Sequence, residues 1–314
     1  MSIAIIGAGL IGRGWAIVFA RAGYEVRVHD VSPEALPKAR EALDVALDDL
    51  HVIGLLADPG AVLAKISLTD DLEHALVGAT YVQECGPEDP DAKRALFAEL
   101  DHLAPPETII ASSTSGILVS RFTDGLPGAN RCLVAHPVNP PYLVPLVELA
   151  PGPATSNEII ASARALLAEV GQVPITVRRE IEGFILNRLQ GTLLNESLRL
   201  VEGGYVSVED LDRTVKNGLG LRWSFMGPFE TIDLNAPGGV VDYANRYGPL
   251  YTRMTESQSV PPDWSEPAIT EVLRQRRAHT PQNALSERQQ WRDRRLMALI
   301  AHQREMNKND ENQE

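Results

Sequence analysis

A histidine, a carboxylate and a hydroxyl group stand in an otherwise apolar stretch in the middle of the chain. They are His136, Glu148 and Ser115. Histidine has an unperturbed pKa of about 6.5, which suits a general base that takes the proton of an alcohol at neutral pH. A carboxylate partner would orient its ring and favour the charged form. From the residues alone, His136 is a candidate base for alcohol oxidation, and a hydrogen-bonded structural histidine is the alternative.

A glycine-rich segment follows the first apolar run of the chain and precedes an amphipathic stretch. Its glycines, Gly7, Gly9 and Gly12, have the spacing of a dinucleotide-binding turn between a strand and a helix. The first glycine allows the tight turn, the second lets the backbone approach a pyrophosphate, and the third lets the helix pack on the strand. With the intervening Leu10 and Ile11, they predict the phosphate-binding part of a cofactor site. A glycine turn that packs without a ligand is the alternative.

Asp30 ends the second predicted strand, where a carboxylate can accept hydrogen bonds from the hydroxyls of the adenine-side ribose. Its charge would repel a 2′-phosphate, and no arginine follows it in residues 31–33. We therefore expect NAD rather than NADP as the cofactor. A helix cap or an ordinary surface position is the alternative for Asp30.

Short β-branched runs alternate with amphipathic stretches as far as about residue 180. This alternation predicts an α/β fold with a doubly wound, mostly parallel sheet of the Rossmann type. Beyond it the pattern is helical, so we place a domain boundary between residues 181 and 182. Residues 1–181 would bind NAD, and residues 182–314 would form a helical substrate and dimerisation domain. The expected strands are residues 3–6, 24–29, 81–84, 108–112, 132–135 and 174–177.

The composition of the 314 residues is that of a globular protein, with 44% hydrophobic and 23% charged side chains. A net charge of −13 disfavours nucleic acid and anionic lipid as partners. Two cysteines, Cys85 and Cys132, are too few for a disulfide framework and lack metal-ligand spacing, so no metal is expected. No apolar run is long enough to span a bilayer, and none resembles a leader, so a cytoplasmic location is expected.

The last forty residues are basic in an otherwise acidic chain. From Arg274 to Lys308, nine basic residues stand against three acidic ones, a net charge of +6. Leu296, Leu299 and Ile300 could line one face of a helix. The simplest interpretation is a charged surface helix that packs on its own subunit or on a neighbouring one.

Two segments resemble signatures of the 3-hydroxyacyl-CoA dehydrogenase family: residues 136–148, which begin His-Pro-Val-Asn-Pro-Pro, and residues 183–188, Gly-Phe-Ile-Leu-Asn-Arg. The similarity extends from about residue 3 to residue 247. It implies that His136 is the catalytic acid and base and that Glu148 pairs with it. It also implies that Ser115 and Asn187 contact the reacting oxygen. A structural role in capping or supporting a helix is the alternative for Asn187.

The resemblance implies roles for three further residues. Glu88 and Lys93 match family positions near the nicotinamide end of the cofactor, and an ordinary surface pair is their alternative. Asn139 is either a substrate-binding residue or a loop residue that fixes the turn after His136.

The substrate is expected to be a small hydroxy or keto acid rather than an acyl-CoA. Residues 30–80 hold ten acidic against three basic side chains, which makes a poor surface for the polyanionic CoA. Arg222 could bind a free carboxylate through two parallel hydrogen bonds, with a structural salt bridge as its alternative. Residues 218–228 around it most resemble the lambda-crystallin and L-gulonate 3-dehydrogenase branch of the family.

The resemblance therefore predicts reversible, NAD-dependent oxidation of the 3-hydroxyl of a hydroxy acid such as L-gulonate. The open alternatives are a short-chain 3-hydroxyacyl-CoA dehydrogenase, an L-carnitine 3-dehydrogenase, a diketo-acid ester reductase and a crystallin-like structural protein. It also implies a homodimer, whose contacts the helical domain would supply.

Overall fold

The computed structural model describes residues 2–311, apart from the side chains of residues 266–268 and 307–311. The chain divides into two compact units. The first contains the residues up to Arg188 together with those from Arg292 onward, and the second runs from Leu189 to Trp291. These units divide the chain at other positions than the predicted boundary between residues 181 and 182. That boundary separates an expected NAD-binding domain from an expected substrate domain, and it stays a prediction.

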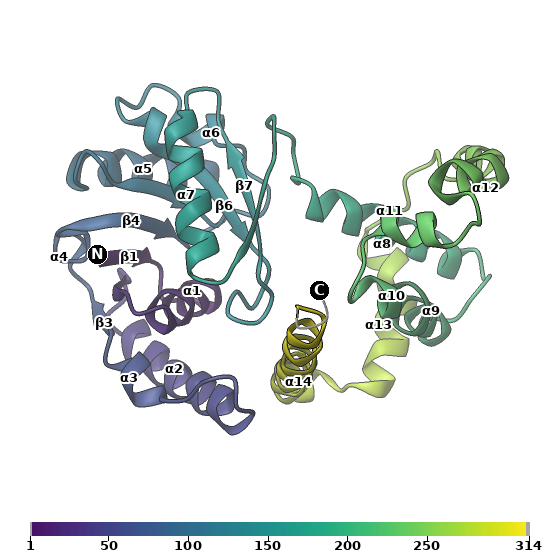
Figure 1. Cartoon of the computed structure of the whole chain (residues 1–314), viewed down its shortest axis with the longest axis horizontal. Coiled ribbons are helices and arrows are strands. Elements are labelled where there is room, and N and C mark those ends of the chain that lie inside the picture. The colour runs from purple at the N-terminus through teal and green to yellow at the C-terminus, as the bar shows by residue number, and fades with distance from the viewer. Residues whose placement is uncertain (1, 312–314) are drawn as a thin grey trace. The chain divides into compact units, whose positions relative to one another are not determined.

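Eight strands of the first unit form one sheet in the order β3-β2-β1-β4-β5-β6-β7-β8 (Figure 1). Neighbouring strands are parallel except for β6 and β7, which are antiparallel. The prediction of a mostly parallel, Rossmann-type sheet is confirmed. The strands are β1 (Ser2–Ile6), β2 (Glu25–His29), β3 (Ile66–Thr69), β4 (Ala79–Glu84), β5 (Ile109–Ser112), β6 (Cys132–Pro137), β7 (Leu146–Pro151) and β8 (Val173–Thr176).

Helices pack on both faces of this sheet because its strands are apolar on both sides. One core includes Trp15 and Phe19 of the first helix, and the other includes Phe97 and Phe122. The helical segments of this unit are α1 (Leu10–Arg21), α2 (Ala35–Val52), α3 (Pro59–Leu63), α4 (Leu72–Leu76), α5 (Pro90–Leu103), α6 (Ser120–Thr123), the 3-10 turn η1 (Ala129–Arg131) and α7 (Asn157–Glu169).

The second unit is helical, and the described part of the chain contains no strand after β8. Few of its side chains are buried, and many large apolar ones are exposed. Its helical segments are α8 (Leu186–Glu202), which begins in the first unit, α9 (Val208–Thr214), the π-helical turn η2 (Val215–Leu219), α10 (Gly220–Trp223), α11 (Pro228–Leu234), α12 (Gly239–Ser257), α13 (Glu266–His279), the 3-10 turn η3 (Gln282–Ala284) and α14 (Leu285–Glu311), which ends in the first unit.

The basic C-terminal segment begins in α13 and continues through helix α14, whose part from Arg292 packs on the first unit. Met297 is only 1% exposed and belongs to the same core as Leu47 and Leu50 of α2. Arg294 forms an ion pair of 3.4 Å with Asp49 of α2. The end of the basic segment thus lies against α2.

The prediction that Leu296, Leu299 and Ile300 line one apolar face of α14 is partly wrong. Leu296 and Ile300 do pack against the core, but Leu299 is 44% exposed, and Met297 takes the central position. Residues three and four positions apart share a helix face, and the face centred on Met297 lies part of a turn away from the predicted one.

Replacing Met297 with alanine should lower the free energy of unfolding by about 2–4 kcal/mol, because it leaves a cavity in a packed core. The matched change Leu299→Ala should alter it by less than about 0.5 kcal/mol, since that side chain is exposed. Urea denaturation followed by circular dichroism measures both. Equal effects of the two substitutions would show that α14 does not pack on the sheet unit through Met297.

Candidate active site

His136 and Glu148 form a buried pair across the antiparallel strands β6 and β7. The two residues are direct register partners, and the Nδ1 atom of His136 lies 2.8 Å from the Oε2 atom of Glu148. Both side chains are almost fully buried. The predicted base and its carboxylate are therefore brought together by the register of one pair of strands.

The second oxygen of Glu148 binds the beginning of helix α8. Its Oε1 atom accepts hydrogen bonds from the backbone N–H groups of Ile185 and Leu186, at 2.8 and 2.9 Å. These donors have no partner within the helix, so Glu148 caps α8 from a neighbouring strand. Burial by itself raises the pKa of Glu148, but the hydrogen bonds from His136 and from the two N–H groups outweigh burial and hold that pKa below its ordinary value.

The backbone just before α8 is strained where it passes the histidine. Phe184 has a φ of +50° and is buried, with its ring centroid 5.5 Å from that of His136. A bulky residue rarely adopts this conformation, and the surrounding contacts must hold it in place. The two hydrogen bonds to Glu148 directly follow Phe184 and supply part of that restraint.

Asn187, in the first turn of α8, contacts the loop after β5. Its Nδ2 atom donates a hydrogen bond of 2.7 Å to the carbonyl oxygen of Ser115. Ser115 itself is exposed, as is Asn139, which follows β6 and precedes a cis peptide bond to Pro140. The structure thus joins the predicted residues in two pairs, His136 with Glu148 and Ser115 with Asn187, and links the pairs through the start of α8.

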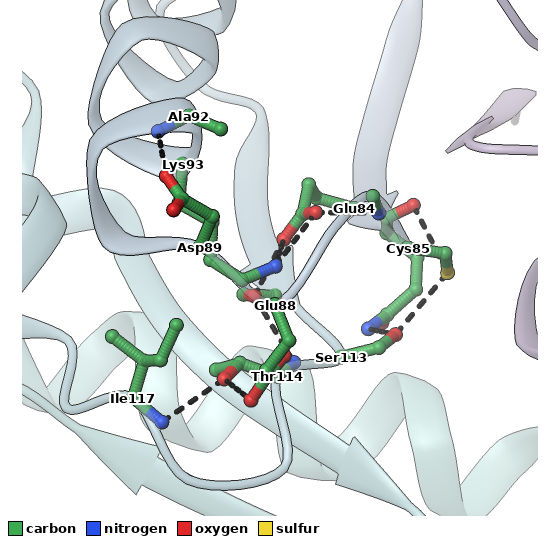
Figure 2. A network of polar contacts seen from close by, with 12 residues as sticks. Glu84, Cys85, Glu88, Asp89, Ala92, Lys93, Ser113, Thr114 and Ile117 are labelled. Carbon is green, nitrogen blue, oxygen red and sulfur yellow. Dashed lines mark hydrogen bonds and ion pairs between the residues drawn. The ribbon is translucent and has the colours of Figure 1, made fainter.

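Glu88 binds the loop that carries Ser115. Its Oε1 atom accepts hydrogen bonds from the Thr114 hydroxyl at 2.6 Å and from the N–H groups of Ser115 and Gly116 at 2.8 and 3.2 Å (Figure 2). Through these contacts, Glu88 positions the loop. Its predicted contact with the cofactor stays a prediction.

Lys93 is buried on a carboxylate that the sequence did not single out. Its Nζ atom lies 2.9 Å from both oxygens of Glu84, and the two side chains are only 2% and 0% exposed. Glu84 also accepts hydrogen bonds from the Ser112 hydroxyl at 2.5 Å and from the N–H of Gly86 at 2.6 Å (Figure 2). Glu84 therefore joins Lys93 of α5 to the ends of β4 and β5. A direct contact of Lys93 with the cofactor stays a prediction.

The glycine loop fits a dinucleotide. Gly7 has a φ of +109°, and a Cβ atom there would lie 2.7 Å from the carbonyl oxygen of Cys85. A Cβ at Gly12 would collide with the carbonyl oxygen of Gly7, whereas a Cβ at Gly9 would meet no atom within 4 Å. Gly7 and Gly12 thus serve the turn and the helix packing, and the open space at Gly9 is where a pyrophosphate could approach the N-terminus of α1.

Asp30 lies beside this loop at the end of β2. Its Oδ2 atom accepts a hydrogen bond of 2.8 Å from the N–H of Ala8, and its Oδ1 atom accepts one of 3.0 Å from the N–H of Ser32. Leu10 and Ile11 follow as the first residues of α1, and Leu10 is exposed. The half-buried carboxylate is therefore fixed next to the turn, where it could accept hydrogen bonds from a ribose.

Arg222 lies in α10 of the second unit and is half-buried. Its guanidinium forms no ion pair with any residue in the described part of the chain. A structural salt bridge at the domain junction stays the alternative for it. Its role toward a substrate stays a prediction.

Sequence reasoning missed Glu84, Gln83 and Ser113, which are polar side chains on or directly after strands. A signal was present, because Gln83 and Glu84 interrupt an otherwise apolar strand. A polar residue inside such a strand must find a partner when the strand is buried. The sequence does not reveal which residue that partner is.

Comparison with known proteins identifies the family. The family model "3-hydroxyacyl-CoA dehydrogenase, NAD binding domain" matches residues 2–181, and the model of the C-terminal domain of the same enzymes matches residues 183–271. The chain belongs to the 3-hydroxyacyl-CoA dehydrogenase family. It is an NAD-dependent oxidoreductase of the 3-hydroxyacyl-CoA and hydroxy acid dehydrogenase type.

Individual relatives place the chain near the predicted branch. It is 44% identical over 308 residues to the lambda-crystallin homolog of Bos taurus, covering 96% of each chain. It is 41% identical over 248 residues to the L-carnitine dehydrogenase of Streptomyces coelicolor, covering 79% of this chain and 77% of the other. A solved 5-formyl-3-hydroxy-2-methylpyridine 4-carboxylic acid 5-dehydrogenase has a TM-score of 0.82 at 28% identity, covering 98% of each chain.

Two other observations concern membranes and metal ions. None of the described helices is long and apolar enough to cross a membrane. Among the described residues, histidine, cysteine and carboxylate side chains form no group that could hold a metal ion.

We predict that Glu148→Gln lowers the free energy of unfolding by about 1–3 kcal/mol at neutral pH, because a charge-assisted network loses its charge. The pKa of Glu148 is lowered by folding, so its ionised form stabilises the protein fully above the ordinary value of 4.5. That stabilisation is lost as the pH falls below 4.5. The difference between wild type and variant should therefore stay nearly constant from neutral pH down to about pH 5 and shrink below 4.5.

Urea denaturation at several pH values measures this, with the exposed Glu107→Gln as the control that should change little at any pH. A difference between wild type and Glu148→Gln that stays constant down to about pH 3 would contradict the prediction.

Proposed function

We propose that the protein oxidises the 3-hydroxyl of a small free hydroxy acid to the 3-keto acid, reversibly and with NAD. The observation that carries this proposal is the His136–Glu148 pair, joined through the start of α8 to Asn187 and Ser115. Such a set contains a base, a group that orients it, and two polar groups that can hold a hydroxyl.

The protonation of His136 follows from its partner. Ionised Glu148 can only accept hydrogen bonds, so Nδ1 of the neutral imidazole carries the hydrogen and Nε2 is left bare. Nε2 is then the atom that takes the proton of the substrate hydroxyl and returns it in the reverse reaction. The charge that develops on the ring is stabilised by Glu148 at 2.8 Å.

Bound NAD supplies a two-electron hydride acceptor. The residues of this chain would hold it at Gly9 and the N-terminus of α1 for the pyrophosphate, and at Asp30 for the adenine-side ribose. Ser115 and Asn187 would orient the substrate hydroxyl toward His136. The carboxylate of Asp30 favours NAD over NADP.

Two features support a free acid as the substrate. Arg222 forms no ion pair with the described residues, which leaves its guanidinium available to a carboxylate. The solved relative with a TM-score of 0.82 is named for a carboxylic acid. L-Gulonate is our first candidate, and L-carnitine is the second because of the relative from Streptomyces coelicolor.

Initial rates of NAD reduction on L-gulonate, L-carnitine, 3-hydroxybutyrate and 3-hydroxybutyryl-CoA at equal concentrations test the proposal, with NADP as a control. We expect a free acid to be preferred. Turnover of the CoA ester alone would contradict the free-acid proposal. Lack of turnover on all four would support a different hydroxy acid, a diketo-acid ester or a crystallin-like structural role instead.

The variant Arg222→Met tests how the acid is recognised. It should raise the KM of the preferred acid about 10- to 100-fold, as expected for a lost charge-assisted contact, and change the KM of its methyl ester far less. The matched control Arg253→Met removes an exposed arginine of the same unit, which donates to the carbonyl of Pro249, and should change neither. Equal effects of Arg222→Met on acid and ester would exclude this role.

We also propose that the protein is a homodimer whose contacts come from the second unit. Phe225 and Phe229 are 74% and 78% exposed, and α8 buries only Leu198. So much exposed apolar surface is typical of an interface. Sedimentation velocity at micromolar concentration tests this, and a monomer there would contradict it.

A further inference from the structure

Phe184 is the only residue other than glycine that has a positive φ in the described part of the chain. Its φ is +50°, and its side chain is buried. Gly183 before it reaches a φ of +76° easily, because glycine has no Cβ atom. Phenylalanine is strained in this region, because its Cβ atom comes too close to the following carbonyl oxygen. Such strain persists only where the surrounding structure holds the residue, and it is typical of functional sites.

The ring of Phe184 lies on the face of the sheet to which His136 points. His136 and Glu148 are register partners, and the next pair on the same face of β6 and β7 is Val134 with Ala150. Val134, Ala150 and Phe184 belong to one buried core. Phe184 therefore covers the strand pair at the point where its apolar row gives way to the histidine and its carboxylate.

Glu148 alone does not fix the plane of the imidazole. A single hydrogen bond of 2.8 Å, between Nδ1 of His136 and Oε2 of Glu148, holds one edge of the ring. The outer torsion of a histidine side chain is broad, so a ring held at one atom can still tilt. Phe184 supplies a second contact, because its ring centroid lies 5.5 Å from that of His136 and the two planes are inclined by 47°. Together the two contacts determine where Nε2 points.

The backbone of Phe184 is held on both sides. Before it, its own N–H donates a hydrogen bond of 3.1 Å to the carbonyl oxygen of Ile181. After it, the N–H groups of Ile185 and Leu186 donate to Oε1 of Glu148. The carboxylate that binds one edge of the histidine therefore also restrains the residue that packs beside its ring.

Burial in the core does not require the strained backbone. Phe97 and Phe122 are fully buried in the same core, with ring centroids 4.6 Å apart, and neither has a positive φ. Phe184 differs from them in its backbone and in its contact with His136. The strain thus accompanies the contact with the histidine rather than burial.

We propose that Phe184 is a positioning residue for the reaction. Its ring holds the imidazole of His136 in the orientation that directs Nε2 toward the substrate hydroxyl, while Glu148 holds the opposite nitrogen. The inference rests on the proposed role of His136 as the base. It does not depend on which hydroxy acid is the substrate.

Phe184→Leu keeps an apolar side chain and removes the aromatic ring. It should lower kcat for NAD reduction with the preferred hydroxy acid about 5- to 30-fold, because a misdirected base takes the proton less efficiently. KM and the affinity for NADH, measured by fluorescence titration, should stay within about threefold of wild type, because the change acts through His136. Phe184→Met serves the same test if the leucine variant does not fold.

The matched control is Phe122→Leu. It removes an aromatic ring from the same core, one that packs on Phe97. It should leave kcat within about twofold of wild type. Urea denaturation of both leucine variants shows whether the loss of stability is comparable.

Nuclear magnetic resonance of isotope-labelled histidine provides a readout that does not need turnover. The signals of His136 are those that disappear in His136→Gln. At mildly alkaline pH, wild type and Phe122→Leu should show one protonated and one bare ring nitrogen, as expected when Glu148 accepts from Nδ1. In Phe184→Leu the two signals should move toward each other or broaden, because a loosened ring exchanges between tautomers.

Unchanged His136 signals or an unchanged kcat in Phe184→Leu would overturn the proposal. Equal losses of kcat in the two leucine variants would also overturn it, because they would indicate a general loosening of the core. Normal turnover by His136→Gln would instead contradict the proposed base. The histidine signals alone would then decide whether Phe184 orients the ring.

Discussion

The carboxylate of Glu148 is the interaction on which the site depends. One oxygen orients His136, and the other binds the two N–H groups at the start of α8. A buried carboxylate needs several donors to stay ionised, and these three supply them. As a result, the base, its charge partner and the helix that carries Asn187 are fixed by one side chain, so none of the three can move alone.

A carboxylate that accepts several hydrogen bonds is also found at the ends of neighbouring strands. Glu84 joins Lys93, Ser112 and Gly86, and Glu88 joins the hydroxyl and N–H groups of residues 114–116. Loops at the carboxyl edge of a parallel sheet leave backbone donors without strand partners, and carboxylates can accept several of them at once. Carboxylates, buried at Glu84 and exposed at Glu88, therefore hold the loops around the site.

The sequence predicts those parts of the structure whose signal is local. The glycine loop and the alternation of strands and helices depend on residues close in sequence, and the histidine with its glutamate twelve residues on matched a known pattern. Partners distant in sequence were not predicted. Lys93 looked like a surface or cofactor residue because only the fold reveals that Glu84 lies behind it, and Met297 was overlooked because α14 has no clear apolar stripe.

A double-mutant cycle tests the central claim, that Glu148 acts on the reaction through His136. We would measure kcat/KM for NAD reduction with the preferred hydroxy acid in the wild type, His136→Gln, Glu148→Gln and the double variant. We predict that His136→Gln lowers kcat/KM about 10²- to 10⁴-fold, and that Glu148→Gln lowers it about tenfold or more when His136 is present but less than about twofold when it is absent. Effects that multiply in the double variant would show that the two residues act independently and would contradict the account.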